Sequence, residues 1–259
     1  MLSFVPVRLM AGDTGLDRLT MREELFGWEA VGRLDIGDRA FCTGVLIASD
    51  LVLTAAHCLS KARDLGRVDD IVFRAGARDG QVIAAVRGKR AVIDSGYDPQ
   101  AAISAETISH DVALLQLETP ISTAIAAPFQ LAELPQAGRK VSVVSYGQGR
   151  KDAPSRQASC SVLGRQQELL AFSCDVTFGS SGAPVFDMSG WRARIVSLVS
   201  AGGQRNGAVA AFGMALPERV QALKYAFRTG DGVFPKTSFT ARRITIGSGN
   251  STGAHFVRP

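Results

Sequence analysis

Short apolar runs, broken every few residues by glycine, aspartate or proline, limit most strongly what this chain can fold into. From residue 28 onward these runs follow one another at close spacing. Such a pattern predicts an all-β fold, either a barrel or a sandwich. We expect strands in two sets: 30–35, 44–47, 51–54, 71–75, 81–87, 90–94 and 112–117, then 140–145, 160–163, 168–172, 184–186, 193–199 and 208–215.

A proline- and alanine-rich stretch at residues 119–135 separates the two sets and is the best internal boundary. Residues 1–27 are charged and lack sustained periodicity, so we expect an N-terminal extension or a propeptide. Pro217 opens a predicted helix at 217–227, because proline is tolerated in a first helical turn. Residues 228–259 are basic and rich in glycine and serine, and we expect them to form a C-terminal tail.

The positive charge of the chain is concentrated near its C-terminus. Residues 226–259 hold five basic residues and one acidic residue, whereas the other 225 residues hold 24 basic and 23 acidic ones. A nearly neutral body argues against a nucleic-acid partner. We expect a solvated tail, with binding to an anionic envelope or polymer as the alternative. No apolar run reaches the ~18 residues of a transmembrane helix, so we expect no transmembrane segment.

Four cysteines, at positions 42, 58, 160 and 174, form two pairs that are close in sequence. There is no CxxC string and there are only three histidines, so we expect no metal site and no cofactor. The even number and local spacing suggest two disulfides and an oxidising compartment, the alternative being free thiols in a cytosolic protein. We therefore expect a secreted or periplasmic protein, although residues 1–10 do not resemble a signal peptide.

Three segments carry residues suited to catalysis. In residues 42–58, two runs lead to a Thr-Ala-Ala turn that presents His57, a candidate for a rigidly held base. Asp111 opens a strongly apolar strand, where a carboxylate needs a partner such as a histidine N–H. In residues 174–186, glycines allow a strained turn that aims backbone N–H groups into a pocket beside Ser181.

Each segment alone fits an ordinary structural role, but together they give a known order. The three strings are Thr-Ala-Ala-His-Cys at 54–58, Asp-Val-Ala-Leu-Leu at 111–115 and Gly-Ser-Ser-Gly-Ala-Pro at 179–184. The chain thereby resembles the chymotrypsin/trypsin-like serine peptidases, and its string from Cys174 is similar to that of the bacterial secreted branch, the glutamyl endopeptidases. The resemblance covers about 28–227. It implies two six-stranded antiparallel β-barrels, about 28–120 and 135–216, and a C-terminal helix.

The resemblance also implies a role for each matching residue. Ser181 is the nucleophile, His57 its base and later the acid, and Asp111 the group that orients the histidine. The N–H groups of Gly179 and Ser181 form the oxyanion hole. Gly182 is expected to keep the approach to Ser181 open.

Further implications concern the surroundings of these residues. Ser200 is the candidate for a late-strand serine that braces the aspartate, with an ordinary strand serine as the alternative. We expect a monomeric enzyme that hydrolyses protein or peptide substrates through an acyl-enzyme. A catalytically silent trypsin-fold binding protein and an esterase are the alternative functions. The implied disulfides are Cys42–Cys58 and Cys160–Cys174.

Specificity is predicted from the residues around the serine string. Asp175 occupies the position whose aspartate, in trypsin, pairs with Arg or Lys, so it predicts that preference; anchoring of the loop is the alternative. Gly202 suggests an open pocket mouth, and the absence of histidine from residues 197–200 argues against glutamate specificity. Ser180 replaces the aspartate that trypsin pairs with a newly freed N-terminal amine, so that switch is absent.

Overall fold

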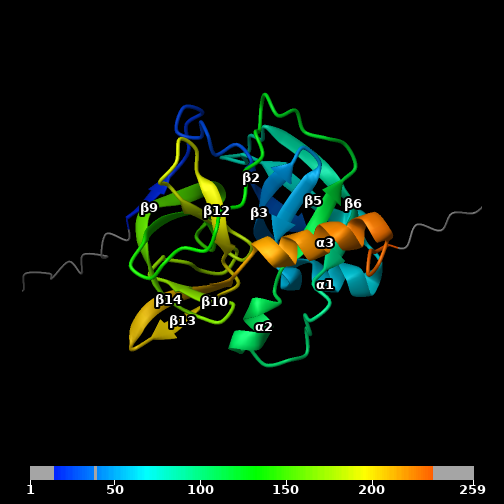
Figure 1. Ribbon diagram of the computed structural model, residues 1–259. Coiled ribbons are helices and arrows are strands. Elements are labelled where there is room, and N and C mark those ends of the chain that lie inside the picture. Colours follow the sequence, from blue (N-terminus) through cyan, green and yellow to red (C-terminus); the bar gives the residue numbers. More distant parts are fainter. Residues whose placement is uncertain (1–14, 38–39, 236–259) are drawn as a thin grey trace, which may run out of the picture.

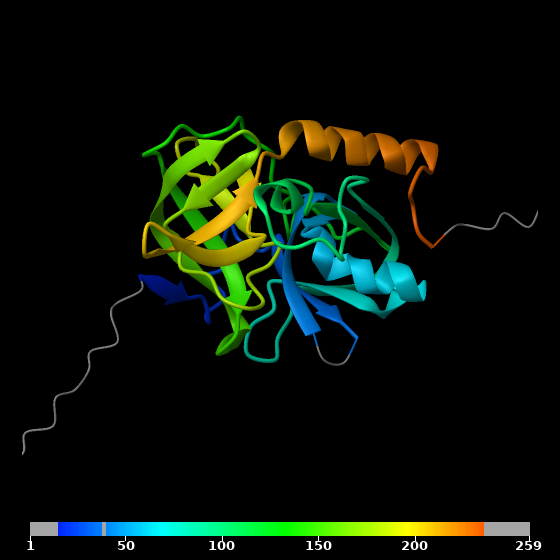
Figure 2. The ribbon, with the colours of Figure 1, turned by 90° about the horizontal axis from the view of Figure 1, so that it is seen from below.

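The computed structural model describes residues 15–37 and 40–235 (Figures 1 and 2). Residues 1–14 of the expected extension and most of the expected tail therefore lie outside the described residues. Two β units lie side by side, and a C-terminal helix, α3 (Pro217–Thr229), crosses to the first unit, where it packs against its strands (Figure 2). None of the helices in the described ranges is long and apolar enough to cross a membrane.

The first unit is a closed antiparallel barrel with the order β2-β3-β4-β7-β6-β5. Alternation of buried and half-buried residues explains its strands: in β5 the side chains of Ile71, Phe73 and Ala75 are buried and the two between are not. The barrel comprises β2 (Val31–Ile36), β3 (Ala40–Ala48), β4 (Leu51–Thr54), β5 (Ile71–Ala75), β6 (Ala84–Ile93) and β7 (Ala113–Leu117).

The second unit is a curled sheet with the order β12-β11-β8-β9-β10-β14-β13. At one end of the sheet, β12 approaches β14 through a side-chain bond, in which Ser197 Oγ donates to Met214 O (2.8 Å). The all-β fold with two barrel-like units is thus confirmed, but the second is a half-barrel and not a closed six-stranded ladder. Its strands are β8 (Lys140–Gly147), β9 (Arg150–Gln166), β10 (Leu169–Phe172), β11 (Pro184–Asp187), β12 (Arg194–Leu198), β13 (Ala201–Arg205) and β14 (Ala208–Met214).

Two helices and a 3-10 turn occur where the sequence pattern predicts none. α1 (Ala56–Leu65) replaces the turn expected before His57, and the turn η1 (Val68–Asp70) follows it. α2 (Ala105–Ser109) lies between the predicted strands 90–94 and 112–117, and Ser104 caps it by accepting a hydrogen bond from the Thr107 backbone N–H.

The described part of the expected extension packs onto the fold. β1 (Leu16–Arg18) pairs antiparallel with β9, and Leu19 and Leu25 are buried. Trp28 then lies against Phe129 of the expected boundary stretch and Phe186 of β11, with ring centroids 6.0 and 5.2 Å away. This aromatic cluster joins the N-terminal segment, the inter-unit connection and the second sheet.

Candidate active site

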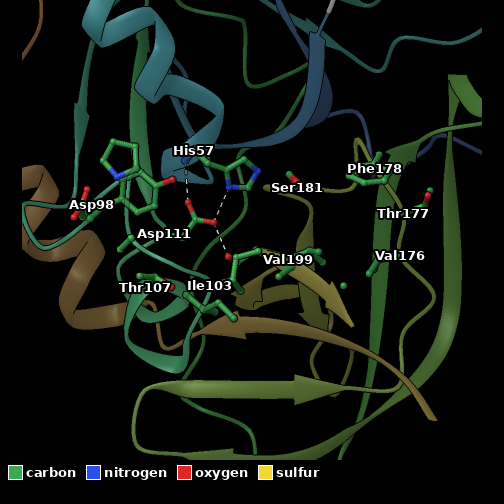
Figure 3. A pocket seen from close by; sticks show the side chains of 17 residues that line it. His57, Asp98, Ile103, Thr107, Asp111, Val176, Thr177, Phe178, Ser181 and Val199 are labelled. Atoms are coloured by element: carbon green, nitrogen blue, oxygen red, sulfur yellow. Dashed lines mark hydrogen bonds and ion pairs between the residues drawn. The ribbon is translucent and has the colours of Figure 1, made fainter. Parts of the chain in front are cut away.

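His57 and Asp111 form a doubly bonded pair. α1 places His57 in its first turn, and Asp111 follows α2 just before β7. The His57 backbone N–H donates to Asp111 Oδ1 (2.9 Å), and His57 Nδ1 lies 2.7 Å from Asp111 Oδ2 (Figure 3). Because both carboxylate oxygens are engaged, the ring is held with Nδ1 toward Asp111 and Nε2 free to face elsewhere.

Ser200 provides the third hydrogen bond to this carboxylate. Its Oγ donates to Asp111 Oδ2 at 2.5 Å, across from the second sheet (Figure 3). Asp111 is only 3% exposed, so three donors compensate for the water that it has lost. The contact is the one expected of a serine that braces the aspartate.

Ser181 lies on the side of the imidazole away from Asp111 (Figure 3). The first barrel holds its loop: Thr43 N–H donates to Ser181 O, and Thr43 Oγ1 donates to Gly179 O, both at 2.9 Å. Gly182 has φ +76°, and a Cβ there would lie 2.2 Å from Thr54 Oγ1. The glycine is therefore required for the close contact between the two β units.

The backbone N–H groups of Gly179 and Ser181 have no acceptor among the described residues, and neither has that of Phe178. By contrast, Ser180 N–H donates to Thr177 O, and Gly182 N–H donates to Val199 O. Unpaired N–H groups are rare in folded chains, so those of Gly179 and Ser181 are available to a bound oxygen.

A cavity of about 730 Å³ is lined by His57, Asp111 and Ser181, whereas Gly179 is not among its lining residues. Ser200 and Gly202 line it, but Asp175 does not. The Asp175 backbone N–H donates to Gln157 Oε1 (2.8 Å), so the structure ties this residue to β9 and away from the cavity wall. The lining includes His57, Asp111, Ser181, Tyr97, Pro99, Ile103, Ile108, Val176, Phe178 and Val199.

A family model described as a trypsin-like peptidase domain matches residues 42–193, more than half of the chain. The chain belongs to the trypsin-like peptidases.

Curated relatives of this peptidase domain are serine proteases. Serine protease 56 of Mus musculus is 33% identical over 135 residues, which is 51% of this chain and 21% of that protein. Trypsin Blo t 3 of Blomia tropicalis is 27% identical over 161 residues, which is 57% of this chain and 53% of that protein. The chain thus spans between a fifth and about half of the length of these relatives.

Solved structures share the fold at low identity. A Glu endopeptidase has a TM-score of 0.67 and 21% identity, with 83% of this chain and 97% of that one covered. A scabies mite inactivated protease paralogue has a TM-score of 0.66 and 16% identity, with 84% and 98% covered. Since one of the two is named as inactivated, the fold leaves the question of activity to the site residues.

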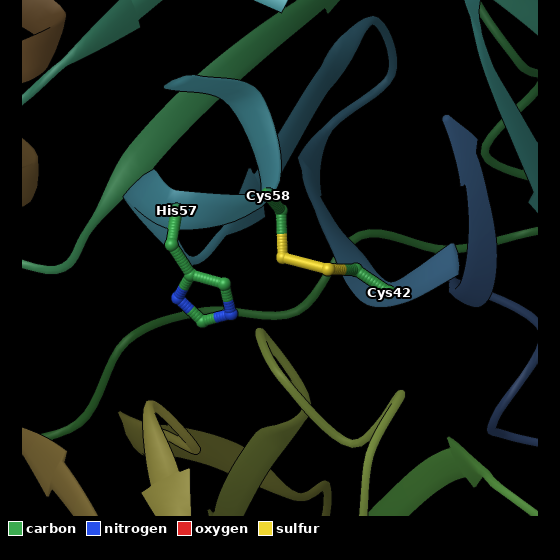
Figure 4. Close-up of side chains that lie close together, drawn as sticks. All are labelled: Cys42, His57 and Cys58. Atoms are coloured by element: carbon green, nitrogen blue, oxygen red, sulfur yellow. A yellow bond between two sulfur atoms is a disulfide. The ribbon is translucent and has the colours of Figure 1, made fainter. Parts of the chain in front are cut away.

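Both expected disulfides of this trypsin-like domain are present, Cys42–Cys58 and Cys160–Cys174. The first lies beside the imidazole of His57 (Figure 4). Although these three side chains come close together, the two sulfurs are bonded to each other and offer no thiolate to a metal. The cluster is therefore structural.

One cavity wall, formed by residues from the segment 97–108, was not predicted from the sequence. Burial, together with the charge of Asp111, raises the pKa of the Tyr97 hydroxyl to about 12. Ile103 is 81% exposed at the rim. Tyr97, an isolated aromatic residue ahead of the string that begins at Asp111, was the one available signal for this cavity wall.

Proposed function

We propose that the chain is a serine endopeptidase that uses Ser181, His57 and Asp111 as a catalytic triad. The observation that carries this proposal is the two-point contact between Asp111 and His57, with Ser181 in the same cavity. A serine hydroxyl is a weak nucleophile at neutral pH and needs a base within reach. The fixed imidazole, with Nε2 turned from the aspartate, meets that need.

In the proposed reaction, Ser181 Oγ attacks the carbonyl carbon of the peptide bond while His57 Nε2 takes its proton. Asp111 stabilises the imidazolium that forms. When the C–N bond breaks, His57 returns the proton to the leaving amine, which leaves an acyl ester on Ser181. Water, deprotonated by His57, then hydrolyses the ester and regenerates the serine.

The carbonyl oxygen becomes negatively charged in this reaction. The unpaired N–H groups of Gly179 and Ser181 support their assignment as its donors. Loss of one such donor typically raises the barrier by ~3 kcal/mol. Strand β13 ends the sheet order and lines the cavity at Ala201 and Gly202, so its free edge is suited to pair with an extended substrate.

For the residue before the cleaved bond, the sequence predicts Arg or Lys through Asp175. The cavity walls favour the other role of Asp175, loop anchoring. A Cβ on Gly202 would lie 3.4 Å from Val176 Cγ2, whereas a substrate carbon between two walls needs about 3.5–4 Å on each side. We therefore propose that Val176 closes the path toward Asp175 and that short, uncharged side chains are preferred.

Two other functions use the same fold. A catalytically silent binding protein would retain the cavity without reacting, and an esterase would use the same triad on esters. The buried, three-donor environment of Asp111 supports the enzyme, because keeping a carboxylate there is costly without a use for the histidine that it orients. The two disulfides support export to a secreted or periplasmic location.

The test is digestion of a mixed peptide library, with products identified by mass spectrometry. We expect cleavage after Ala, Ser, Thr or Val by the wild type and none by Ser181→Ala. Val176→Gly should add cleavage after Arg and Lys. Cleavage after Arg or Lys by the wild type would overturn the specificity, and equal cleavage by Ser181→Ala would overturn the enzyme itself. Ester turnover without peptide turnover would favour the esterase.

A further inference from the structure

A guanidinium that the proposed reaction does not use lies against the serine loop. Arg150 begins β9, and its Nη1 donates to Ser145 O at 2.6 Å. Its Nη2 donates to Ser145 Oγ (3.0 Å) and to Ser180 Oγ (3.2 Å). Ser180 is the residue immediately before the nucleophile, so the cation contacts the loop directly.

The space for this side chain depends on Gly147. A Cβ there would lie 2.9 Å from Arg150 Cζ and Nε, and 2.8 Å from Thr177 Cγ2. The guanidinium therefore packs closely against the backbone at the end of β8, next to the start of the serine loop. A side chain at position 147 would therefore displace the guanidinium.

Ser180 connects the guanidinium to the loop backbone. It is fully buried, and its Oγ accepts a hydrogen bond from Thr177 N–H (3.3 Å) in addition to that from Arg150. The hydroxyl hydrogen can in turn reach Tyr146 O (3.2 Å) or Ser145 Oγ (3.3 Å). The two residues next to Ser180, Gly179 and Ser181, carry the unpaired N–H groups assigned to the bound oxygen.

The charge of Asp175 also favours the buried position of the Arg150 guanidinium, on the side of the loop away from the cavity. Burial lowers the pKa of the Arg150 guanidinium, and the Asp175 carboxylate opposes that shift. Neither Arg150, Asp175 nor Ser180 lines the cavity, whereas Thr177 and Ser181 do. The cation and the aspartate thus belong to the support of the loop.

We propose that Arg150 is a positioning residue that holds loop 177–181, through Ser180, in the conformation that aims the Gly179 and Ser181 N–H groups at substrate. This role presupposes the peptidase activity proposed above. This role also explains the serine at position 180. Because its neutral hydroxyl is bonded to the Arg150 guanidinium, it needs no newly freed N-terminal amine as a partner. Consistently, the loop has these bonds while residues 15–30 are still attached and packed.

A double-mutant cycle tests this link. Arg150→Lys keeps the charge but loses the planar fork, and Ser180→Ala removes the acceptor while the Arg150 bonds to Ser145 remain. We expect each variant to lower kcat about tenfold with little change in KM, as for one hydrogen bond to a charged group. The double variant should lose no more than either single variant, because both break the same link.

Arg156→Lys is the matched control, since Arg156 is also on β9, half-buried and bonded to a serine hydroxyl, but away from loop 177–181. It should leave kcat unchanged. Wild-type kcat in both single variants, an additive loss of about a hundredfold in the double variant, or an equal loss in the control would each overturn the role of Arg150. An inactive wild type would instead refute the proposed peptidase, so the two failures are distinct.

A second measurement concerns the N-terminus. The chain, with residues 1–30 shown by intact mass to be attached, should react with a fluorophosphonate probe at Ser181 as fast as a sample whose N-terminal segment has been trimmed. Reaction only after trimming would overturn the inference that Arg150 replaces the amine.

Discussion

Replacing Ser200 by Ala isolates one of the three hydrogen bonds that hold Asp111. The variant removes the 2.5 Å bond to Oδ2 and leaves both bonds to His57 in place. A hydrogen bond to a charged group contributes about 1.5–3 kcal/mol. Because Ser200 is only half-buried and lines the cavity, water can enter the space that it leaves, which favours the lower value.

We therefore expect kcat/KM for peptide cleavage to fall about tenfold in Ser200→Ala, the equivalent of about 1.4 kcal/mol. Steady-state kinetics on a single peptide measure this, with urea denaturation to measure the free energy of unfolding. Ser197→Ala is the matched control: it also loses a bond from a serine hydroxyl in the same stretch of chain, to Met214 O at 2.8 Å, but does not contact Asp111.

The control should be less stable yet retain kcat/KM per folded molecule. An unchanged kcat/KM in Ser200→Ala would refute the bracing role. So would an equal decrease in both variants, because that would mean a general loss of packing.

Three further outcomes follow from the structure. Gly182→Ala should destabilise the fold by about 3 kcal/mol in urea denaturation, since its Cβ has no space and the backbone is left-handed; an unchanged midpoint would contradict this. Burial raises the pKa of Tyr146 above its ordinary value of 10.0, so stability is full below pH 10 and is lost above it. Tyr146→Phe should flatten that alkaline loss, and an unaltered pH profile would refute its cause. Converting Cys42 and Cys58 to Ser should cost about 3 kcal/mol, because the bridge closes a 16-residue separation, and a smaller loss than for the Cys160–Cys174 pair would contradict that estimate.

Where the information is local, the sequence could single out residues that the structure brings to one cavity. His57, Asp111 and Ser181 lie in short strings whose glycines, cysteines and apolar neighbours have direct structural meaning. The first ten residues of β9 are mostly polar and without alternation, so the strand that they form depends on pairing with β8 and β1 and was predicted only over 160–163.

Contacts between distant residues could not be predicted in this way. The narrow gap between Val176 and Gly202 depends on how two segments meet, and it is the basis for the proposal that Asp175 anchors its loop. Similarly, nothing in the string around Ser180 indicates that Arg150, 30 positions earlier, supplies its partner.

Labelling with a fluorophosphonate probe, followed by mapping of the modified peptide, tests the central claim most directly. Activation of one serine by His57 predicts one probe per chain, attached to Ser181, and none on Ser181→Ala or His57→Ala. The absence of label on the folded wild-type chain, or label that persists in His57→Ala at the wild-type rate, would contradict the triad.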